Sequence, residues 1–94
     1  MIIKFSTEAE LEFRESINFY NKRKKGLGKT FSNEIKKKIL FISKNPLSSA
    51  NKYSNIRVTV LAKFPFTIHY KMSEDLLLIV AIFHSSRSPE NLER

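Results

Sequence analysis

The stretch FPFTIHYKMSEDLLLIVAIFH, residues 64–84, contains two strand patterns joined by a polar turn. In its first half, apolar and polar residues alternate from Phe66 to Lys71, which is typical of a strand with one buried face. Ser73-Glu74-Asp75 is expected to form the turn. Residues 76–83 are apolar throughout, which indicates a central strand covered on much of both faces. The stretch therefore predicts a β-hairpin in the middle of a sheet.

Two more strands are expected outside this hairpin. Residues 56–60 alternate with period two and predict a strand next to it. The alternation divides the side chains of that strand between two faces, with Ile56, Val58 and Val60 on one and Arg57 and Thr59 on the other. Residues 1–5 predict a short first strand. Residues 48–55 are polar and are expected to form a loop.

The segment between the first strand and this loop carries two helical patterns. Ser6 or Thr7 is expected to cap the first helix, and Thr7 with Glu10 matches a capping box. Gly26-Leu27-Gly28 is expected to break the chain between the helices, so that the second runs over residues 29–44 and ends at Asn45-Pro46. Apolar residues recur at helical spacing in both segments, so each helix has one stripe that a sheet must cover.

These elements predict an α+β fold. A strand and an αα-hairpin are followed by three antiparallel strands, which form one sheet with the helices packed on one face. A chain of 94 residues makes a single domain, residues 1–94. It has no Cys and only two His, so we expect no disulfide framework, no metal site and no cofactor. No apolar run reaches the roughly 20 residues of a membrane span, and no signal peptide is evident, so a cytoplasmic protein is expected.

The positive charge is concentrated in the middle of the chain. The formal net charge is +8, yet residues 22–71 hold thirteen Lys and Arg residues and one acid, Glu34, which makes +12 for that segment. Four of the nine acids lie near the N-terminus, at Glu8, Glu10, Glu12 and Glu15. A small domain this basic is expected to bind something acidic, which can be nucleic acid, an anionic surface or an acidic protein.

Candidate chemistry lies where the last predicted strand ends. His84 and Arg87 follow the apolar run directly, where a histidine can move a proton near neutral pH and an arginine can hold a phosphate. A histidine at a strand end is more often structural, so this signal is weak taken alone. His69, in the middle of its strand, is interpreted as a half-exposed sheet residue.

Four short segments together resemble the RelE/ParE superfamily of bacterial toxins from type II toxin–antitoxin modules. They are Gly26-Leu27-Gly28, Asn45-Pro46, the run from Phe64 to Tyr70, and Ala81-Ile82-Phe83-His84-Ser85-Ser86-Arg87-Ser88-Pro89-Glu90. The resemblance covers nearly the whole chain. It implies a growth-inhibiting toxin, of the kind linked to plasmid stabilisation, that is neutralised by a cognate acidic antitoxin.

The resemblance leaves the target open between two branches. RelE-like members are nucleases that cut messenger RNA on the ribosome, whereas ParE-like members poison DNA gyrase. The nuclease reading implies that Arg57 and Arg87 hold the scissile phosphate and that His84 moves a proton. Whichever branch applies, Lys52, Arg57, Lys63 and Arg87 are candidates for binding a partner or nucleic acid.

The sequence departs from the nuclease pattern on two strands. Thr67 stands where RelE-like nucleases commonly have an arginine, and Thr59 stands where a second basic residue is expected. We therefore favour a ParE-like toxin that acts on gyrase by binding. The alternatives are a ribosome-dependent endoribonuclease and a degenerate member that has lost its toxicity, so whether the chain is an enzyme stays open.

Overall fold

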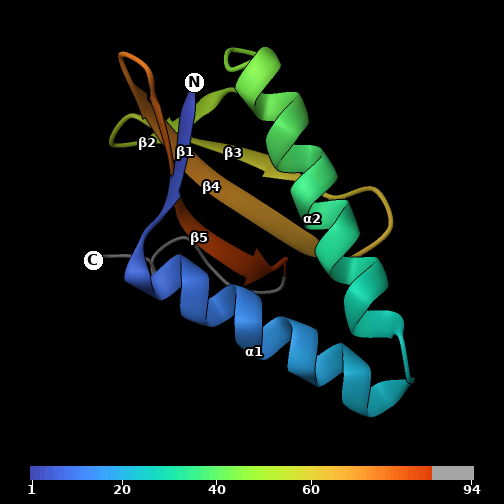
Figure 1. Cartoon of the computed structure of the whole chain (residues 1–94). Coiled ribbons are helices and arrows are strands. Elements are labelled where there is room, and N and C mark those ends of the chain that lie inside the picture. The colour runs from blue at the N-terminus through green and yellow to red at the C-terminus, as the bar shows by residue number, and fades with distance from the viewer. Residues whose placement is uncertain (86–94) are drawn as a thin grey trace.

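The computed structural model describes residues 1–85, which form two helices and a sheet of five strands (Figure 1). The elements are β1 (Ile2–Phe5), α1 (Thr7–Arg23), α2 (Leu27–Lys44), β2 (Asn51–Tyr53), β3 (Ile56–Val60), β4 (Phe66–Ser73) and β5 (Leu76–His84). The predicted α+β class and order of elements are confirmed. The loop predicted over residues 48–55 is wrong in part, because its second half contains β2.

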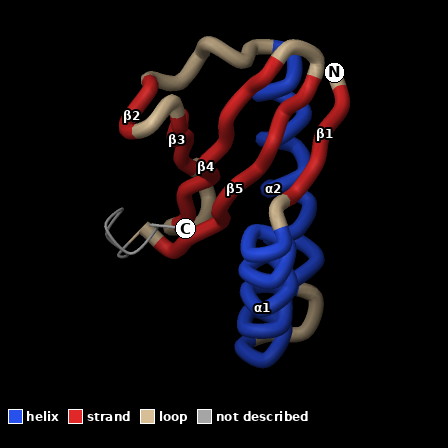
Figure 2. The backbone as a smooth tube through the Cα atoms, turned by 90° about the vertical axis from the view of Figure 1, so that its left-hand side faces the viewer, coloured by secondary structure: helices blue, strands red, loops and turns tan. Residues whose placement is uncertain are grey.

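The sheet has the strand order β1-β5-β4-β3-β2 (Figure 2). The strands β3, β4 and β5 are antiparallel neighbours, as the sequence predicts. β1 joins the other side of β5 in parallel, with Ile2 opposite Leu76 and Phe5 opposite Ile79. Both helices lie on one side of this sheet. The opposite side, turned away from the helices, is called the outer face below.

The N-cap of the first helix lies one residue before the predicted capping box. Ser6 is the N-cap, and its hydroxyl accepts a hydrogen bond of 3.0 Å from the amide of Ala9. Thr7 is already helical, so it does not form the predicted pair with Glu10. The Glu10 carboxylate instead accepts from Arg14, one turn further along the helix. The prediction of a polar cap at residue 6 or 7 is right, and that of a capping box is wrong.

The two glycines near the turn between the helices have different structural roles. Gly26 has a φ of 85°, a left-handed conformation that glycine adopts without a steric penalty, and it caps α2. α2 starts at Leu27, two residues earlier than predicted, so Gly28 lies inside the helix. A Cβ atom on Gly28 would lie 2.5 Å from the carbonyl oxygen of Ile17 on α1. The missing side chain thus lets the two helices pack backbone to backbone.

We expect Gly28→Ala to lower the free energy of unfolding by about 1–3 kcal/mol, because the added methyl group forces the helices apart. The Asn21 side chain, which accepts a hydrogen bond of 2.9 Å from the Gly28 amide, would also have to move. Urea unfolding followed by circular dichroism measures the change. Lys29→Ala at the next, exposed position is the control and should shift stability by less than about 0.5 kcal/mol. Equal effects of the two substitutions would contradict this account of Gly28.

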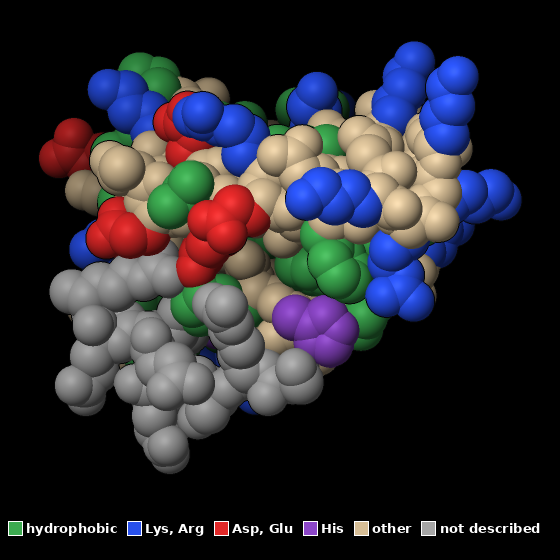
Figure 3. All heavy atoms as spheres, turned by 90° about the horizontal axis from the view of Figure 1, so that it is seen from below, with side chains coloured by type: hydrophobic (Ala, Val, Ile, Leu, Met, Phe, Trp, Pro, Cys, Tyr) green, Lys and Arg blue, Asp and Glu red, His purple; other side chains and the backbone are tan. Residues whose placement is uncertain are grey.

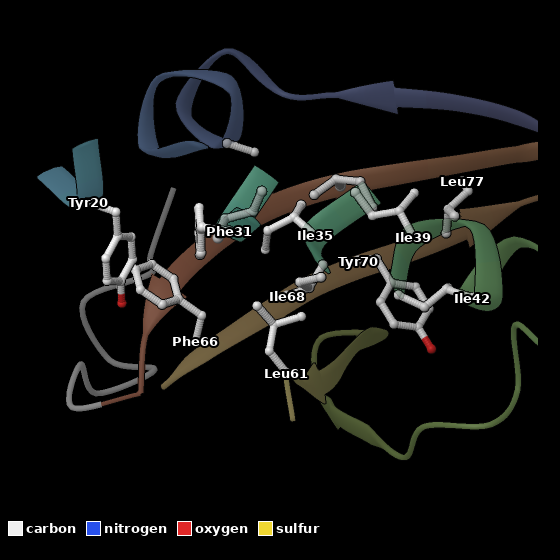
Figure 4. Packing of buried hydrophobic residues seen from close by; sticks show 13 residues of the cluster. Tyr20, Phe31, Ile35, Ile39, Ile42, Leu61, Phe66, Ile68, Tyr70 and Leu77 are labelled. Atoms are coloured by element: carbon white, nitrogen blue, oxygen red, sulfur yellow. The ribbon is translucent and has the colours of Figure 1, made fainter. Parts of the chain in front are cut away.

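The main core lies between α2 and the helix-facing side of the sheet (Figure 4). From α2, the side chains of Phe31, Ile35, Ile39 and Ile42 point at the sheet, and each is at most 4% exposed. From β4, Phe66, Ile68 and Tyr70 meet them. Tyr20 of α1 closes one end of this core, and burial raises the pKa of its phenol, an effect that the charge of Arg23 partly opposes.

A β-bulge explains the apolar run in β5. Tyr70 pairs with Ile79, but the preceding residue His69 pairs with Ala81, so Val80 is an extra residue on β5. Before the bulge, Leu77 and Ile79 face the helices. After it, Ile82 faces the helices, whereas Ala81 and Phe83 pack on the outer face. The run is apolar because both sides of this central strand are covered.

The predicted alternation in β3 is present, and the register shows which way each set points. Val58 pairs with His69 and Val60 with Thr67, so these valines lie on the outer face. Arg57 pairs with Tyr70 and Thr59 with Ile68, which places both on the helix-facing side. Among the described residues, no helix is long and apolar enough to cross a membrane.

Candidate functional site

A hydrogen-bonded histidine lies at the centre of the outer face. His69 is only 4% exposed, so the interpretation of a half-exposed residue is wrong. Its Nδ1 lies 2.9 Å from the hydroxyl of Tyr53 on β2, and its Nε2 lies 2.9 Å from the hydroxyl of Thr67 on its own strand. Its ring also meets the ring of Phe83 edge-on, at 5.5 Å between centroids. Both ring nitrogens are therefore engaged, as a buried polar group requires.

One tautomer of this histidine satisfies all three hydrogen bonds. In it, Nε2 carries the proton and donates to the Thr67 hydroxyl, which donates to the carbonyl of Phe83 at 3.5 Å. Nδ1 then accepts the proton of the Tyr53 hydroxyl. The result is a directed chain from Tyr53 through His69 and Thr67 to the backbone of β5. Such a chain joins three strands and is chemically a satisfied structural network.

The outer face around His69 is apolar and hydroxylic. Its described side chains at this end of the sheet are Tyr53, Ile56, Val58, Val60, Thr67, His69, Ala81 and Phe83, as strand pairing and the packing of Ala81 and Phe83 place them. None of these eight is cationic. Lys71 lies on the same face two residues beyond His69, and it is exposed near the β4–β5 turn. Within residues 1–85, this part of the face therefore lacks the clustered Lys and Arg that would stabilise a phosphate in a cleavage reaction.

Arg57 forms a structural hydrogen bond on the helix-facing side of the sheet. Its guanidinium donates a close hydrogen bond to the carbonyl of Ser49, in the segment that follows α2. Beside it, the hydroxyl of Tyr70 donates to the carbonyl of Pro46 at 3.1 Å. The two side chains together hold the segment that connects α2 to β2. Arg57 thus lies on the face opposite the His69 network.

The structure does not bring Arg57 and His84 together. His84 ends β5 and is exposed, with its ring 5.5 Å from that of Phe66, its partner on β4. Arg57 pairs with Tyr70, four residues from Phe66, which is about 13 Å further along β4. The third predicted site residue, Arg87, lies outside the described residues 1–85. No group of three or more acidic or histidine side chains within residues 1–85 could hold a metal ion.

The two lysines predicted to bind a partner lie in different places. Lys52 is exposed on β2, at one edge of the sheet. Lys63 lies in the β3–β4 connection, with its ammonium 3.9 Å from the carboxylate of Glu34 on α2. They therefore belong to different parts of the surface. Tyr53 lies in the segment predicted to be a loop, and nothing in the sequence signals its role, because only the fold brings its hydroxyl to His69.

The charges of α1 are separated along its length. Acidic residues lie in the first half of the helix, and Lys22, Arg23, Lys24 and Lys25 are exposed at its end and in the following turn. Figure 3 shows acidic side chains towards one end of the underside and Lys and Arg side chains towards the other. One of the acids also has a backbone partner, because the Glu12 carboxylate accepts from the amide of Ile82 at 3.0 Å. The cationic end of the helical hairpin is left without neighbouring acids on α1.

Comparison with known proteins places this fold among toxin–antitoxin proteins. Residues 3–89 match the family model of the ParE toxin of type II toxin–antitoxin systems, parDE. A chain of the chromosomal ParDE system from P. aeruginosa is similar, with a TM-score of 0.78, 14% identity and coverage of 89% of this chain and 95% of that one. A search of curated protein sequences gives no significant match.

Two solved E. coli structures show the same fold. A chain of the intact RelBE toxin–antitoxin complex matches with a TM-score of 0.67 and 20% identity, covering 92% of this chain and 98% of that one. The isolated RelE toxin matches with a TM-score of 0.68 and 16% identity, covering 98% of this chain and 92% of that one.

Proposed function

Because this chain belongs to the family of ParE toxins from type II toxin–antitoxin systems, we propose that it inhibits growth in the cytoplasm by binding DNA gyrase. A cognate acidic antitoxin neutralises it in this proposal. The proposed gyrase target distinguishes this chain from the RelE-like branch, whose members cut messenger RNA on the ribosome.

The observation that supports binding over cleavage is the composition of the outer face. Cleavage at a phosphate develops negative charge, which nucleases of this kind stabilise with clustered cations. The eight outer-face side chains around His69 include none, and the Arg57 guanidinium is bound to a backbone carbonyl on the other side. Thr59 and Thr67, where the nuclease pattern expects basic residues, lie on opposite faces, and the Thr67 hydroxyl serves the His69 network.

The antitoxin is proposed from charge and from the similar complexes. The segment from residue 22 to residue 71 carries +12, which favours fast association with an acidic chain. The similar structures include chains from ParDE and RelBE toxin–antitoxin systems. Lys52, Lys63 and Arg87 stay candidates for such contacts. Lys63 already has an acid beside it in the free chain, because the carboxylate of Glu34 lies 3.9 Å from its ammonium.

A supercoiling assay tests the gyrase target. Purified chain is added to DNA gyrase, relaxed plasmid and ATP, and we expect loss of supercoiling at micromolar protein. The matched control is the same amount of chain mixed beforehand with the antitoxin, which is expected to be the acidic polypeptide encoded by the neighbouring reading frame. This mixture should leave supercoiling intact. Full supercoiling at micromolar free chain would count decisively against gyrase as the target.

The nuclease alternative rests on the exposure of His84 and on the likeness of the fold to RelE. In that case His84 moves a proton while Arg57 and Arg87 hold the phosphate. Mapping of messenger 5′ ends after induction detects cleavage directly. A cleavage pattern that is lost in the His84→Ala/Arg87→Ala double variant would replace the gyrase proposal with this one. Intact messengers after induction, together with unaffected supercoiling, would point to a degenerate member.

A further inference from the structure

The solvent side of α2 combines lysines with two exposed apolar residues. Leu40 is 56% exposed and Phe41 is 48% exposed, although both lie on a helix whose other side builds the core. Figure 1 shows α2 lying across the sheet with one side towards it, and no helix or strand of residues 1–85 lies over its other side. The exposed cations on this side are Lys29, Lys36, Lys37 and Lys44. The one acid of α2, Glu34, is mostly buried and lies beside Lys63.

The spacing of these residues forms a compact pattern. Lys37 and Lys44 are seven residues apart, which is about two turns and roughly 10.5 Å along the helix axis. Each of them is three or four residues from both Leu40 and Phe41, so each is their neighbour on the helix surface. Two apolar side chains are thus bracketed by cations above and below. We call Lys36, Lys37, Leu40, Phe41 and Lys44 the α2 patch.

The backbone of α2 limits what can recognise this patch. Its interior amides and carbonyls are paired within the helix, so an extended strand laid on it would gain no main-chain hydrogen bonds. On a second helix, side chains seven residues apart lie on the same side and are separated by the same distance as Lys37 and Lys44. Carboxylates at that interval would meet both lysines, and apolar residues between them would cover Leu40 and Phe41.

A nucleic acid fits the same patch less well. Lysines bind phosphate, but a base must stack on an open aromatic face to use Phe41. The ammonium of Lys38 lies over one face of that ring, 5.3 Å from its centroid, and competes with a base for that face. Leu40 offers apolar surface that gains nothing from a phosphate backbone. The mixture of charge and apolar area therefore favours a protein partner.

We propose that the α2 patch docks an acidic amphipathic helix of a partner protein. Leu40 and Phe41 are the apolar anchors, and Lys36, Lys37 and Lys44 pair with its carboxylates. The proposal rests on the proposed function in one respect, since the acidic partner expected there is the antitoxin. It adds the location of the contact, the form of the bound segment and the residues that anchor it.

Charge reversal at matched sites tests the docking. The full chain carrying Lys36→Glu, Lys37→Glu and Lys44→Glu is compared with one carrying Lys22→Glu, Lys24→Glu and Lys25→Glu. Both variants change the net charge equally, but the second set lies at the end of α1 and in the turn that follows it. Titration calorimetry with the polypeptide from the neighbouring reading frame measures Kd. We expect the first variant to weaken binding by about tenfold or more and the second by less than about threefold. Equal weakening would mean general electrostatic attraction and would overturn the proposal.

A second pair of variants tests the apolar anchors. Leu40→Ala/Phe41→Ala should also weaken binding by about tenfold, whereas Leu11→Ala/Phe19→Ala, at exposed apolar residues of α1, should change it little. The effect of the lysine variant should shrink in high salt, and that of the apolar variant should persist. Unchanged binding by the Leu40→Ala/Phe41→Ala variant would overturn the docking. Unchanged melting temperatures ensure that each variant is folded.

The two proposals fail in different ways. If gyrase is not the target, supercoiling is unaffected by the free chain, yet the α2 variants still lose the partner. If the docking is wrong, the free chain still inhibits gyrase, but the α2 variants bind the partner as tightly as the unmodified chain does. The last measurement is the binding of a labelled single-stranded RNA to the unmodified chain and to the lysine variant. Loss of RNA binding in the lysine variant, with partner binding intact, would assign the patch to nucleic acid and overturn the proposal.

Discussion

Replacing Phe31 by alanine should lower the free energy of unfolding by about 3–5 kcal/mol, a large share of the roughly 5–15 kcal/mol available to a domain of this size. Phe31 is completely buried at the centre of an aromatic cluster. Its ring centroid lies 4.8 Å from that of Phe66, 5.1 Å from that of Tyr20 and 5.2 Å from that of Phe64. Alanine would leave a cavity that these rings cannot close, because they are fixed on α1, on β4 and in the β3–β4 connection.

Urea unfolding of the purified variant measures this loss, and α2 itself supplies the control. Phe41→Ala removes the same side chain from the same helix, but Phe41 is 48% exposed, so its loss should cost less than about 1 kcal/mol. Similar losses for the two variants would mean that the core is not organised around Phe31. Because the two phenylalanines differ in burial and not in helix propensity, the comparison isolates packing.

The parts of this fold that the sequence predicts are those in which periodicity and burial agree. The stripe of Phe31, Ile35, Ile39 and Ile42 predicts α2, and the alternation of Phe66, Ile68 and Tyr70 predicts β4. All of these side chains point into one core. β2 was not predicted because a strand of three residues, two of them polar, carries no periodic signal. It pairs irregularly with β3, and the Tyr53 hydroxyl joins it to His69.

The candidate site was less predictable, because which face a residue lies on is a tertiary property. Arg57 is the residue type that a phosphate site needs, but only the register with Tyr70 shows that it lies on the helix-facing side. The alternation of Thr67, His69 and Lys71 looks like a solvated face. The burial of His69 depends on Tyr53 and Phe83, which come from other strands. The β-bulge at Val80 could not be predicted, because the apolar run of β5 continues through it without interruption.

His69→Leu should destabilise the chain by about 2–4 kcal/mol, since it removes two buried hydrogen bonds and leaves the Tyr53 hydroxyl without its nitrogen acceptor. Tyr53→Phe alone should cost about 1–3 kcal/mol, because Nδ1 of the buried His69 then loses its donor. The double variant removes both ends of that hydrogen bond. Its cost should therefore fall short of the sum of the two single costs by about 1 kcal/mol or more. Strict additivity in urea unfolding would mean that Tyr53 and His69 are not coupled.

The same variants separate a structural histidine from a catalytic one. If the Tyr53–His69–Thr67 chain only joins β2, β4 and β5, the Tyr53→Phe/His69→Leu double variant should still inhibit gyrase at a temperature where it is folded. If His69 were a general base, the folded double variant would be inactive, because a leucine cannot accept a proton. Thr67→Val provides the control within the network, since it keeps the shape of the side chain and removes only its hydroxyl. Loss of toxicity in the folded double variant, with toxicity retained in Thr67→Val, would assign His69 a chemical role and contradict a toxin that acts by binding.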